Sequence, residues 1–135
     1  MNSLSLEVIT PERVVVRDEA EIVEARGALG DFGILAGHIQ FLTTIEIGEI
    51  RYVKDGVVKS LATSGGFCEV HDDKVTLLVD TAEFAHEIDV DRAKKALSRA
   101  ESALKELSQE EEEYRRHELA LMRAIARISA ASGNQ

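Results

Sequence analysis

Residues 27–38 read Gly27-Ala28-Leu29-Gly30-Asp31-Phe32-Gly33-Ile34-Leu35-Ala36-Gly37-His38, and the same mixture of glycine and apolar residues continues to Gly48. This composition is too apolar for a free linker and too rich in glycine for a helix. Glycine tolerates a positive φ without steric penalty, so it suits tight bends. We therefore expect a rigid structural loop within a β domain.

The spacing of Gly27, Gly30 and Gly33 invites comparison with a nucleotide-binding turn. A phosphate loop needs a Gly-Lys-Ser or Gly-Lys-Thr ending, and a dinucleotide turn needs the pattern G-x-G-x-x-G. Neither pattern occurs in the sequence. The glycine-rich segment is therefore not predicted to hold a nucleotide.

Short alternating segments surround the glycine-rich stretch and indicate β-strands. The polar triplet Arg17–Glu19 is expected to separate two of them, and Asp55-Gly56 and His71–Asp73 are expected to form hairpin turns. Strands are predicted at residues 4–8, 14–16, 20–25, 51–54, 57–61, 67–70 and 75–79. Many short strands with frequent turns predict a sandwich or barrel.

The apolar period lengthens after Asp89, which is well placed as a helix N-cap. One apolar stripe is formed by Ala93, Leu97, Ala100, Leu104 and Leu107. Ser108-Gln109 interrupts the pattern, and Glu110–Glu113 suit the start of a second helix. The predicted fold class is α+β: an antiparallel β-sandwich over residues 1–87, then an antiparallel two-helix hairpin over residues 88–135.

The second helix is expected to be amphipathic. One predicted apolar face consists of Tyr114, Leu121, Ile125 and Ile128, and the opposite face carries Arg116, Arg123 and Arg127. Alanines in the first helix limit the area that the two helices bury together, and at ~25 cal/mol per Å² such a pair is marginal. The hairpin must therefore pack against the β domain or against another protein. A weakly docked element with two possible partners can act as a conformational switch.

Composition and charge exclude several protein classes. No run approaches the ~18 apolar residues of a membrane span, and the N-terminus lacks the pattern of a secretory signal. The lone Cys68 fits a reducing compartment. The net charge of −9 resides in residues 1–88, which carry seven Lys and Arg against 16 Asp and Glu. An acidic body argues against nucleic acid as a partner.

Chemistry-bearing residues form no catalytic or metal pattern. The sequence contains no H-x-x-x-H and no C-x-x-C, so no metal site is predicted. Ser64-Gly65-Gly66 lacks the G-x-S-x-G nucleophile turn, and no general base is evident. The chain is therefore not expected to be an enzyme by itself. From charge and spacing alone, Asp89 and Arg92 suit a helix cap with an exposed ion pair.

Three motifs, taken in order, resemble the epsilon-subunit family of the bacterial rotary F-type ATP synthase. They are Gly30–His38, then Ser64–Phe67 with Glu69-Val70, then Ile88-Asp89-x-x-Arg92-Ala93. The resemblance extends over essentially the whole chain. Members usually have proline where this chain has Ala36 and Gln40, so the loop lacks two fixed φ angles.

The resemblance implies a non-catalytic rotor subunit, peripheral to the cytoplasmic face of the bacterial plasma membrane. The β-sandwich would bind the gamma subunit and the c-ring, with Asp31 and His38 in the region that faces them. The hairpin would fold down, or extend towards the beta and alpha subunits and inhibit ATP hydrolysis. It would then meet an acidic segment of beta through Arg115, Arg116, Arg123 and Arg127.

In some members the folded-down hairpin binds ATP as a regulatory ligand, and no cofactor is required. The positions that match are Glu83, Ile88, Asp89, Arg92, Ala93, Arg99, Arg116, Arg123 and Arg127. The alternative function is a stand-alone β-sandwich module that binds proteins and dimerises through its helices.

Overall fold

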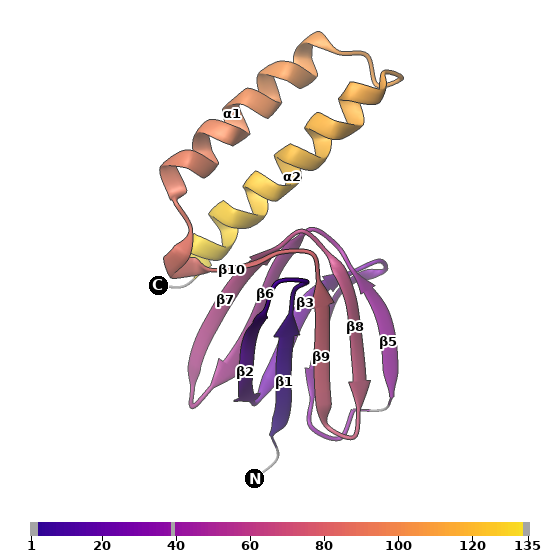
Figure 1. Ribbon diagram of the computed structural model, residues 1–135, viewed down its shortest axis with the longest axis vertical. Helices are drawn as coiled ribbons and strands as arrows, with labels where there is room; N and C mark the ends of the chain where they lie inside the picture. Colours follow the sequence, from indigo (N-terminus) through magenta and orange to yellow (C-terminus); the bar gives the residue numbers. More distant parts are fainter. Residues whose placement is uncertain (1–2, 39, 134–135) are drawn as a thin grey trace.

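Ten strands precede two helices in the computed structural model, which describes residues 3–38 and 40–133. The strands are β1 Leu4–Ile9, β2 Val14–Ala20, β3 Ile22–Gly27, β4 Gly30–Leu35, β5 Phe41–Ile45, β6 Gly48–Lys54, β7 Val57–Thr63, β8 Gly66–His71, β9 Lys74–Val79 and β10 Ala82–Phe84. A 3-10 turn, η1 Ala85–Glu87, leads into α1 Val90–Glu106 and α2 Glu112–Gly133. The helices form an antiparallel hairpin at one end of the strands (Figure 1), which confirms the predicted fold class. The outer ends of the two predicted domains, residues 1–2 and 134–135, lie outside the described residues.

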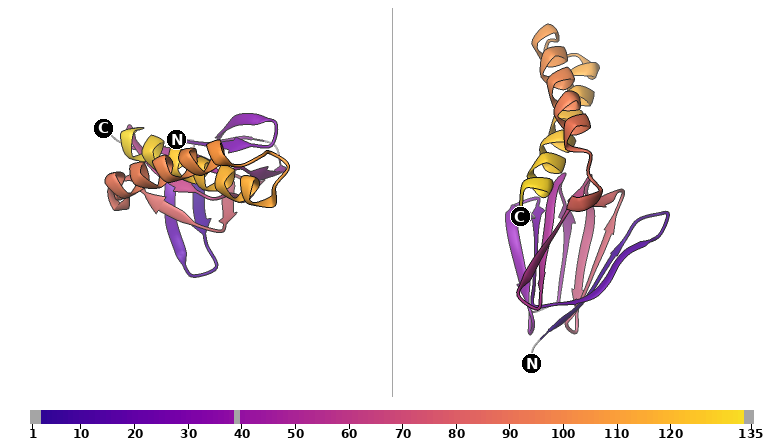
Figure 2. Two further views of the ribbon diagram at one scale, coloured as in Figure 1. Left: turned by 90° about the horizontal axis from the view of Figure 1, so that it is seen from above. Right: turned by 90° about the vertical axis from the view of Figure 1, so that its left-hand side faces the viewer.

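The strands form one continuous hydrogen-bonded path that folds over on itself. Its order is β10-β7-β6-β3-β5-β8-β9-β1-β2, and β4 pairs with β3 beside this path. The path forms two layers, one with β10, β7 and β6 and the other with β5, β8, β9, β1 and β2. Strand β3 joins them, since residues 22–24 pair with β6 and Gly27 pairs with β5. All pairs are antiparallel except β1 with β9, which is parallel. The hairpin caps one end of this body, and the start of β1 lies towards the other end (Figure 2).

Two tight turns have the backbone geometry that their sequences predict. Asp55 and Gly56 have φ values of 51° and 76° between β6 and β7, and Asp72 and Asp73 have values of 49° and 59° between β8 and β9. Two consecutive residues with positive φ match the right-handed twist of the flanking strands. Aspartate and glycine tolerate this conformation better than most residues do.

The prediction of a loop over the glycine-rich stretch was wrong for its central part. Residues 30–35 form β4, which pairs with β3 from Gly27↔Gly30 to Ile22↔Leu35. Phe32 and Ile34 alternate with glycine and pack against the core, so the period of two is present, but small residues conceal it. The following turn is anchored, because Gly37, at φ 85°, donates its N–H to Asp73 Oδ1 at 2.7 Å.

The predicted break at Arg17–Glu19 was also wrong, because these residues lie inside β2. Two of their polar side chains find partners on other strands: Arg17 Nε lies 3.0 Å from Glu7 Oε2 of the adjacent β1, and Asp18 pairs with Lys54 of β6. A polar run need not interrupt a strand at the end of the hydrogen-bonded path, because Arg17 and Glu19 face solvent, while Asp18, on the same side as the buried Val16 and Ala20, is paired with Lys54.

Inward-facing aliphatic side chains from both layers make the main core. Tyr52 and Cys68 are buried among them, with the aliphatic members Leu4, Leu6, Val8, Val23, Ile34, Ile50, Leu61, Val75 and Leu77. Burial raises the pKa of the Cys68 thiol to about 12. The thiol is therefore an inert core group rather than a nucleophile.

Gly66 tests how tightly β8 fits between β5 and β9. A Cβ at this position would lie 2.0 Å from the backbone oxygen of Leu78. Because backbone cannot move aside cheaply, Gly66→Ala is expected to lower the free energy of unfolding by about 3 kcal/mol, measured by urea denaturation. Gly33→Ala is the control, since its nearest neighbour would be Ile22 Cδ1 at 3.6 Å. Equal stability of the two variants would contradict this packing.

Candidate functional site

Helix α2 docks the hairpin onto the sandwich. It contacts β6, β7, β10 and η1, while α1 packs mainly against α2. A small second core forms where Ala126 and Ala130 of α2 meet Ala62 of β7 and Ile88. Two polar contacts flank this core: Ser129 Oγ donates to Glu49 Oε1 at 3.2 Å, and Arg127 Nε donates to Glu83 Oε1 at 2.7 Å.

The predicted apolar face of α2 was wrong at Ile125, whose exposed fraction is 51%. The buried positions of this helix are instead Ala124, Ala126 and Ala130. Alanines let the helix approach the strands closely, so the small-residue side faces inward and the branched side chain is left at the edge. The predicted start of α2 was also early, since Glu110 and Glu111 lie in the turn before Glu112.

A cavity of about 420 Å³ opens between the β10–η1 segment and the two helices. It is lined by Glu83, Glu87, Asp89, Arg92, Ala93, Ala96, Arg99, Ala120, Arg123 and Arg127. Its volume lies in the range of small-molecule sites. The lining is strongly charged, with four arginines, three carboxylates and small alanines between them, so a charged ligand is favoured.

Local structure explains how the side chains converge. Asp89 Oδ1 accepts from the backbone N–H of Arg92 at 3.1 Å, which starts α1 at the cavity edge. Positions 92, 96 and 99 then fall on one side of α1, and positions 120, 123 and 127 on one side of α2. Glu87 Oε1 accepts from the backbone N–H of Phe84 at 3.0 Å and thereby closes the η1 turn.

The charges in the cavity are only partly compensated. Arg127 is paired with Glu83, and both side chains are about 40% exposed, at 40% and 39%. Among the described residues, Arg92, Arg99 and Arg123 form no ion pair. Guanidinium groups bind phosphate and carboxylate oxygens through paired N–H donors. The arrangement can therefore bind an anion with several oxygens.

The structure brings seven of the nine predicted nucleotide-site residues to this cavity: Glu83, Asp89, Arg92, Ala93, Arg99, Arg123 and Arg127. Ile88 lies beside it in the small core with Ala126 and Ala130. Arg116 does not line the cavity and pairs instead with Glu113 at 3.4 Å. The sequence reasoning missed Glu87, whose position two residues before the helix cap was the only available signal.

The four arginines of α2 do not act as one stripe in this arrangement. Arg115 pairs with Glu118 at 2.6 Å, and Arg116 pairs with Glu113, both near the start of the helix. Arg123 and Arg127 face the cavity. Arg123 and Arg127 therefore belong to the cavity, whereas Arg115 and Arg116 pair with acidic residues of the same helix.

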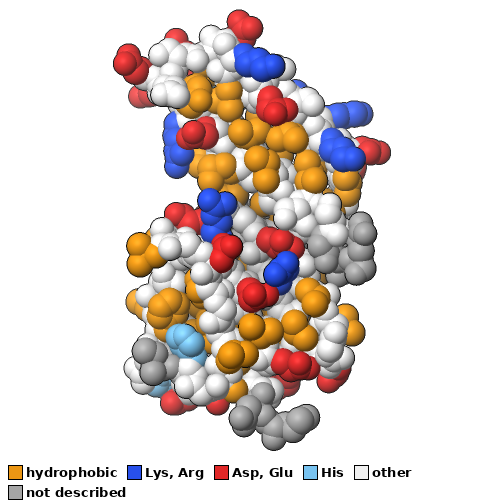
Figure 3. All heavy atoms as spheres, turned by 180° about the vertical axis from the view of Figure 1, so that it is seen from behind, with side chains coloured by type: hydrophobic (Ala, Val, Ile, Leu, Met, Phe, Trp, Pro, Cys, Tyr) orange, Lys and Arg blue, Asp and Glu red, His pale blue; other side chains and the backbone are white. Residues whose placement is uncertain are grey.

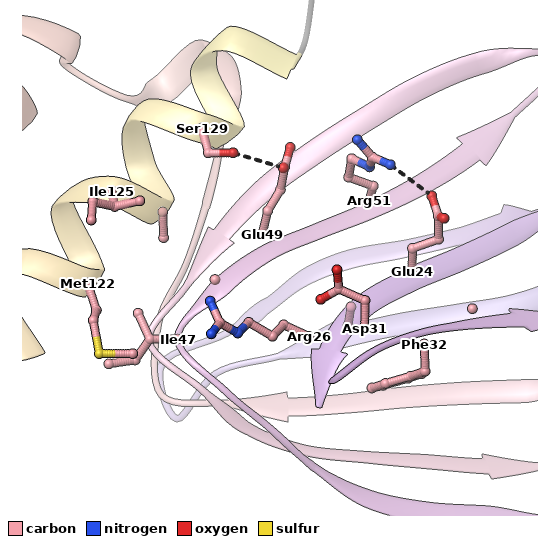
Figure 4. Close-up of a pocket in the computed structure, with 14 residues that line it drawn as sticks. Glu24, Arg26, Asp31, Phe32, Ile47, Glu49, Arg51, Met122, Ile125 and Ser129 are labelled. Atoms are coloured by element: carbon pink, nitrogen blue, oxygen red, sulfur yellow. Dashed lines mark hydrogen bonds and ion pairs between the residues drawn. The ribbon is translucent and has the colours of Figure 1, made fainter. Parts of the chain in front are cut away.

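Asp31 and His38 lie at opposite ends of β4. Asp31 lines a second cavity, about 470 Å³, in the angle between α2 and strands β3, β4 and β6 (Figure 4). His38 follows the other end of β4, where its ring lies 5.4 Å from that of Phe41 in an edge-on arrangement. These two residues therefore do not form one compact cluster.

The second cavity combines charged and apolar walls. Figure 4 shows Arg26 and Asp31 on the strand side, with Met122 and Ile125 on the helix side. Acidic and basic side chains are interleaved between the hairpin and the sandwich, below an apolar area of the helices (Figure 3).

A row of apolar side chains crosses the outward face of strands β8, β9, β1 and β2. Phe67 of β8 is directly opposite Leu78 of β9, which is opposite Ile9 of β1, which is opposite Val14 of β2. Phe67 and Leu78 have exposed fractions of 56% and 51%. Contiguous patches of exposed apolar side chains are uncommon on monomeric proteins and often mark surfaces that bind other proteins.

Metal binding has no support in the described part of the chain, where no three His, Cys, Asp or Glu side chains come close enough to hold an ion. None of the helices within residues 3–38 and 40–133 is long and apolar enough to cross a bilayer.

Comparison with known proteins gives consistent matches over both parts of the chain. The family models described as the beta-sandwich domain and the long alpha-helix domain of the ATP synthase delta/epsilon chain match residues 3–85 and 86–132. The ATP synthase epsilon chain of Geotalea daltonii is 52% identical over 128 residues, covering 95% of this chain and 93% of the relative. That of Desulfitobacterium hafniense is 52% identical over 130 residues, covering 96% of each.

A solved structure shares the fold. A chain in the cryo-EM structure of the Euglena gracilis mitochondrial ATP synthase, OSCP/F1/c-ring in rotational state 1, superimposes with a TM-score of 0.83 at 24% identity. The match covers 98% of this chain and 82% of that chain.

Proposed function

The chain belongs to the ATP synthase delta/epsilon-chain family, as a non-catalytic epsilon chain, and from this premise we propose a rotor subunit with a mobile regulatory hairpin. Residues 1–87 bind the gamma subunit and the c-ring and help to couple their rotation to ATP synthesis. Residues 88–135 inhibit ATP hydrolysis when they extend, and ATP favours the folded-down state. The subunit lies peripherally at the cytoplasmic face of the bacterial plasma membrane.

One observation carries the regulatory part: the arginine-rich cavity has walls from both the β10–η1 segment and the two helices. Such a cavity exists only while α2 is docked. A ligand that bridges these walls stabilises the docked state by its preference for that state. Regulation by a ligand therefore requires no further moving part.

ATP fits the chemistry of this cavity. The triphosphate carries several anionic oxygens, which match the guanidinium groups of Arg92, Arg99, Arg123 and Arg127. The alanines at positions 93, 96 and 120 leave space for a flat ring between the helices. Ile88 supports the cavity from the small core, whereas Arg116 would need a rearranged hairpin to reach the ligand.

Calorimetry of the isolated full chain tests ATP binding. Arg92→Ala is expected to weaken the affinity by about tenfold to a hundredfold, because a charge-assisted hydrogen bond contributes about 1.5–3 kcal/mol. Lys94→Ala is the matched control, since Lys94 is exposed on α1 outside the cavity. No heat at millimolar ATP, or equal affinities of the two variants, would refute the proposal.

Inhibition requires the hairpin to leave the sandwich. The docking surface consists largely of alanines, which bury little apolar area. In the docked state Arg123 and Arg127 face the cavity and are not presented to another subunit. Extension would release them, together with Arg115 and Arg116, towards an acidic segment of the beta subunit and its alpha neighbour. Docking and inhibition thus exclude each other.

Removal of α2 tests this inhibition in the assembled enzyme. A chain that ends after Leu107 retains the sandwich but lacks the arginines of α2, so ATP hydrolysis should rise several-fold over the enzyme with the full chain. Complexes of equal subunit composition are compared by their hydrolysis rates. Unchanged hydrolysis would show that the hairpin does not inhibit.

The rotor contact is supported by the apolar row on the outer face of the sandwich. This row offers a partner the exposed side chains of Phe67 and Leu78. Asp31 and His38, at opposite ends of β4, are proposed to face rotor subunits at two separate places rather than at one. The gamma subunit and the c-ring provide two such partners.

Co-elution with the gamma subunit tests the rotor contact against the alternative of a self-associating module. The double variant Phe67→Ser, Leu78→Ser should weaken the one-to-one complex by at least about tenfold, since it removes two large apolar contacts. Leu29→Ser, on the fully exposed β3–β4 turn, is the control. A dimer of the chain that does not co-elute with gamma would favour the alternative.

A further inference from the structure

The ion pair between Glu83 and Arg127 joins the two parts of the molecule. Glu83 belongs to β10 at the edge of the sandwich, and Arg127 belongs to α2, 44 residues later. Their nitrogen and oxygen lie 2.7 Å apart. It is the only ion pair among the described residues that links the sandwich to the hairpin.

We infer that the Glu83–Arg127 pair is a latch that holds the hairpin docked without any nucleotide. The pair lies directly beside the alanine core, in which Ala126, the neighbour of Arg127, is buried. Moving α2 away from β7 separates the two charges at once. The latch and the alanine contacts therefore break together.

The strength of such a pair suits a latch that opens. A half-exposed ion pair contributes little free energy, because water and salt screen it. The alanine core also buries little area. The docked state is therefore only modestly favoured. Reversing the charge at position 83 or 127 consequently shifts the equilibrium between the docked and the open hairpin by a measurable amount.

The latch gives Glu83 a role that does not depend on a ligand. Its carboxylate orients Arg127, so a nucleotide meets an arginine that already has an anionic partner. Arg92, Arg99 and Arg123, which form no ion pair among the described residues, meet the ligand without an anionic partner, whereas Arg127 meets it already paired with Glu83. Docking by the latch thus persists in a chain that cannot bind ATP.

A buried thiol beneath α2 reports docking directly. Ala62 is 5% exposed and is covered by Ala126 and Ala130, so Ala62→Cys introduces a thiol that reacts only when the hairpin opens. The native Cys68 is fully buried in the sandwich core and reports global unfolding in the same sample. The full chain is measured without nucleotide in this background.

Charge reversal then tests the latch by a double-mutant cycle. Glu83→Arg and Arg127→Glu should each speed the modification of the introduced thiol about tenfold, because like charges then face each other. The double variant Glu83→Arg, Arg127→Glu should return to within about twofold of the starting rate. Glu101→Arg, an exposed reversal on α1, should leave the rate unchanged.

Two outcomes would overturn the latch. In the first, the introduced thiol reacts at the starting rate in both single reversals. In the second, it reacts as fast in the double variant as in the single reversals. Faster reaction of Cys68 would reveal loss of the sandwich fold, and the neutral pair Glu83→Gln and Arg127→Gln then replaces the reversals. Because the assay contains no nucleotide, failure of ATP binding leaves its result intact.

Discussion

The contact of two alanines of α2 with the sandwich is the interaction on which the other features depend. Ala126 and Ala130 allow the helix backbone to approach Ala62 of β7, with Ile88 in the same cluster. That approach creates the second wall of the arginine-rich cavity and brings Arg127 to Glu83. Larger side chains would strengthen the contact but hold the helix farther away. Close approach with little buried area is what makes docking both specific and reversible.

Features set by neighbouring residues were predictable from the sequence, while those set by distant contacts were not. The Asp55-Gly56 turn, the Asp89 cap and the helical stripe that contains Ala93 and Ala100 are local, and the structure confirms each. Strand β4 was missed because its pairing with β3, rather than its composition, makes it a strand. The inward face of α2 was misjudged because it is selected by the shape of the sandwich.

The candidate site followed the same division. Helical periodicity placed Arg116, Arg123 and Arg127 on one face of the second helix, and the family resemblance supplied Arg92 and Arg99 on the first. That the two faces meet across a cavity depends on how the hairpin packs. Arg116 shares the periodicity of Arg123, yet it lies about 10 Å farther along α2, beyond the end of the cavity. Periodicity specifies direction around a helix, and packing specifies how far along it a site extends.

Strand β3 has a mechanical consequence for the sandwich. Because residues 22–24 are bonded to β6 and Gly27 is bonded to β5, one unbroken backbone segment belongs to both layers. A sideways force on one layer is therefore carried to the other through covalent bonds and ladder hydrogen bonds. Two layers joined only by side chains would transmit the same force through packing, which slides more readily. The sandwich consequently resists shear as a single stiff block.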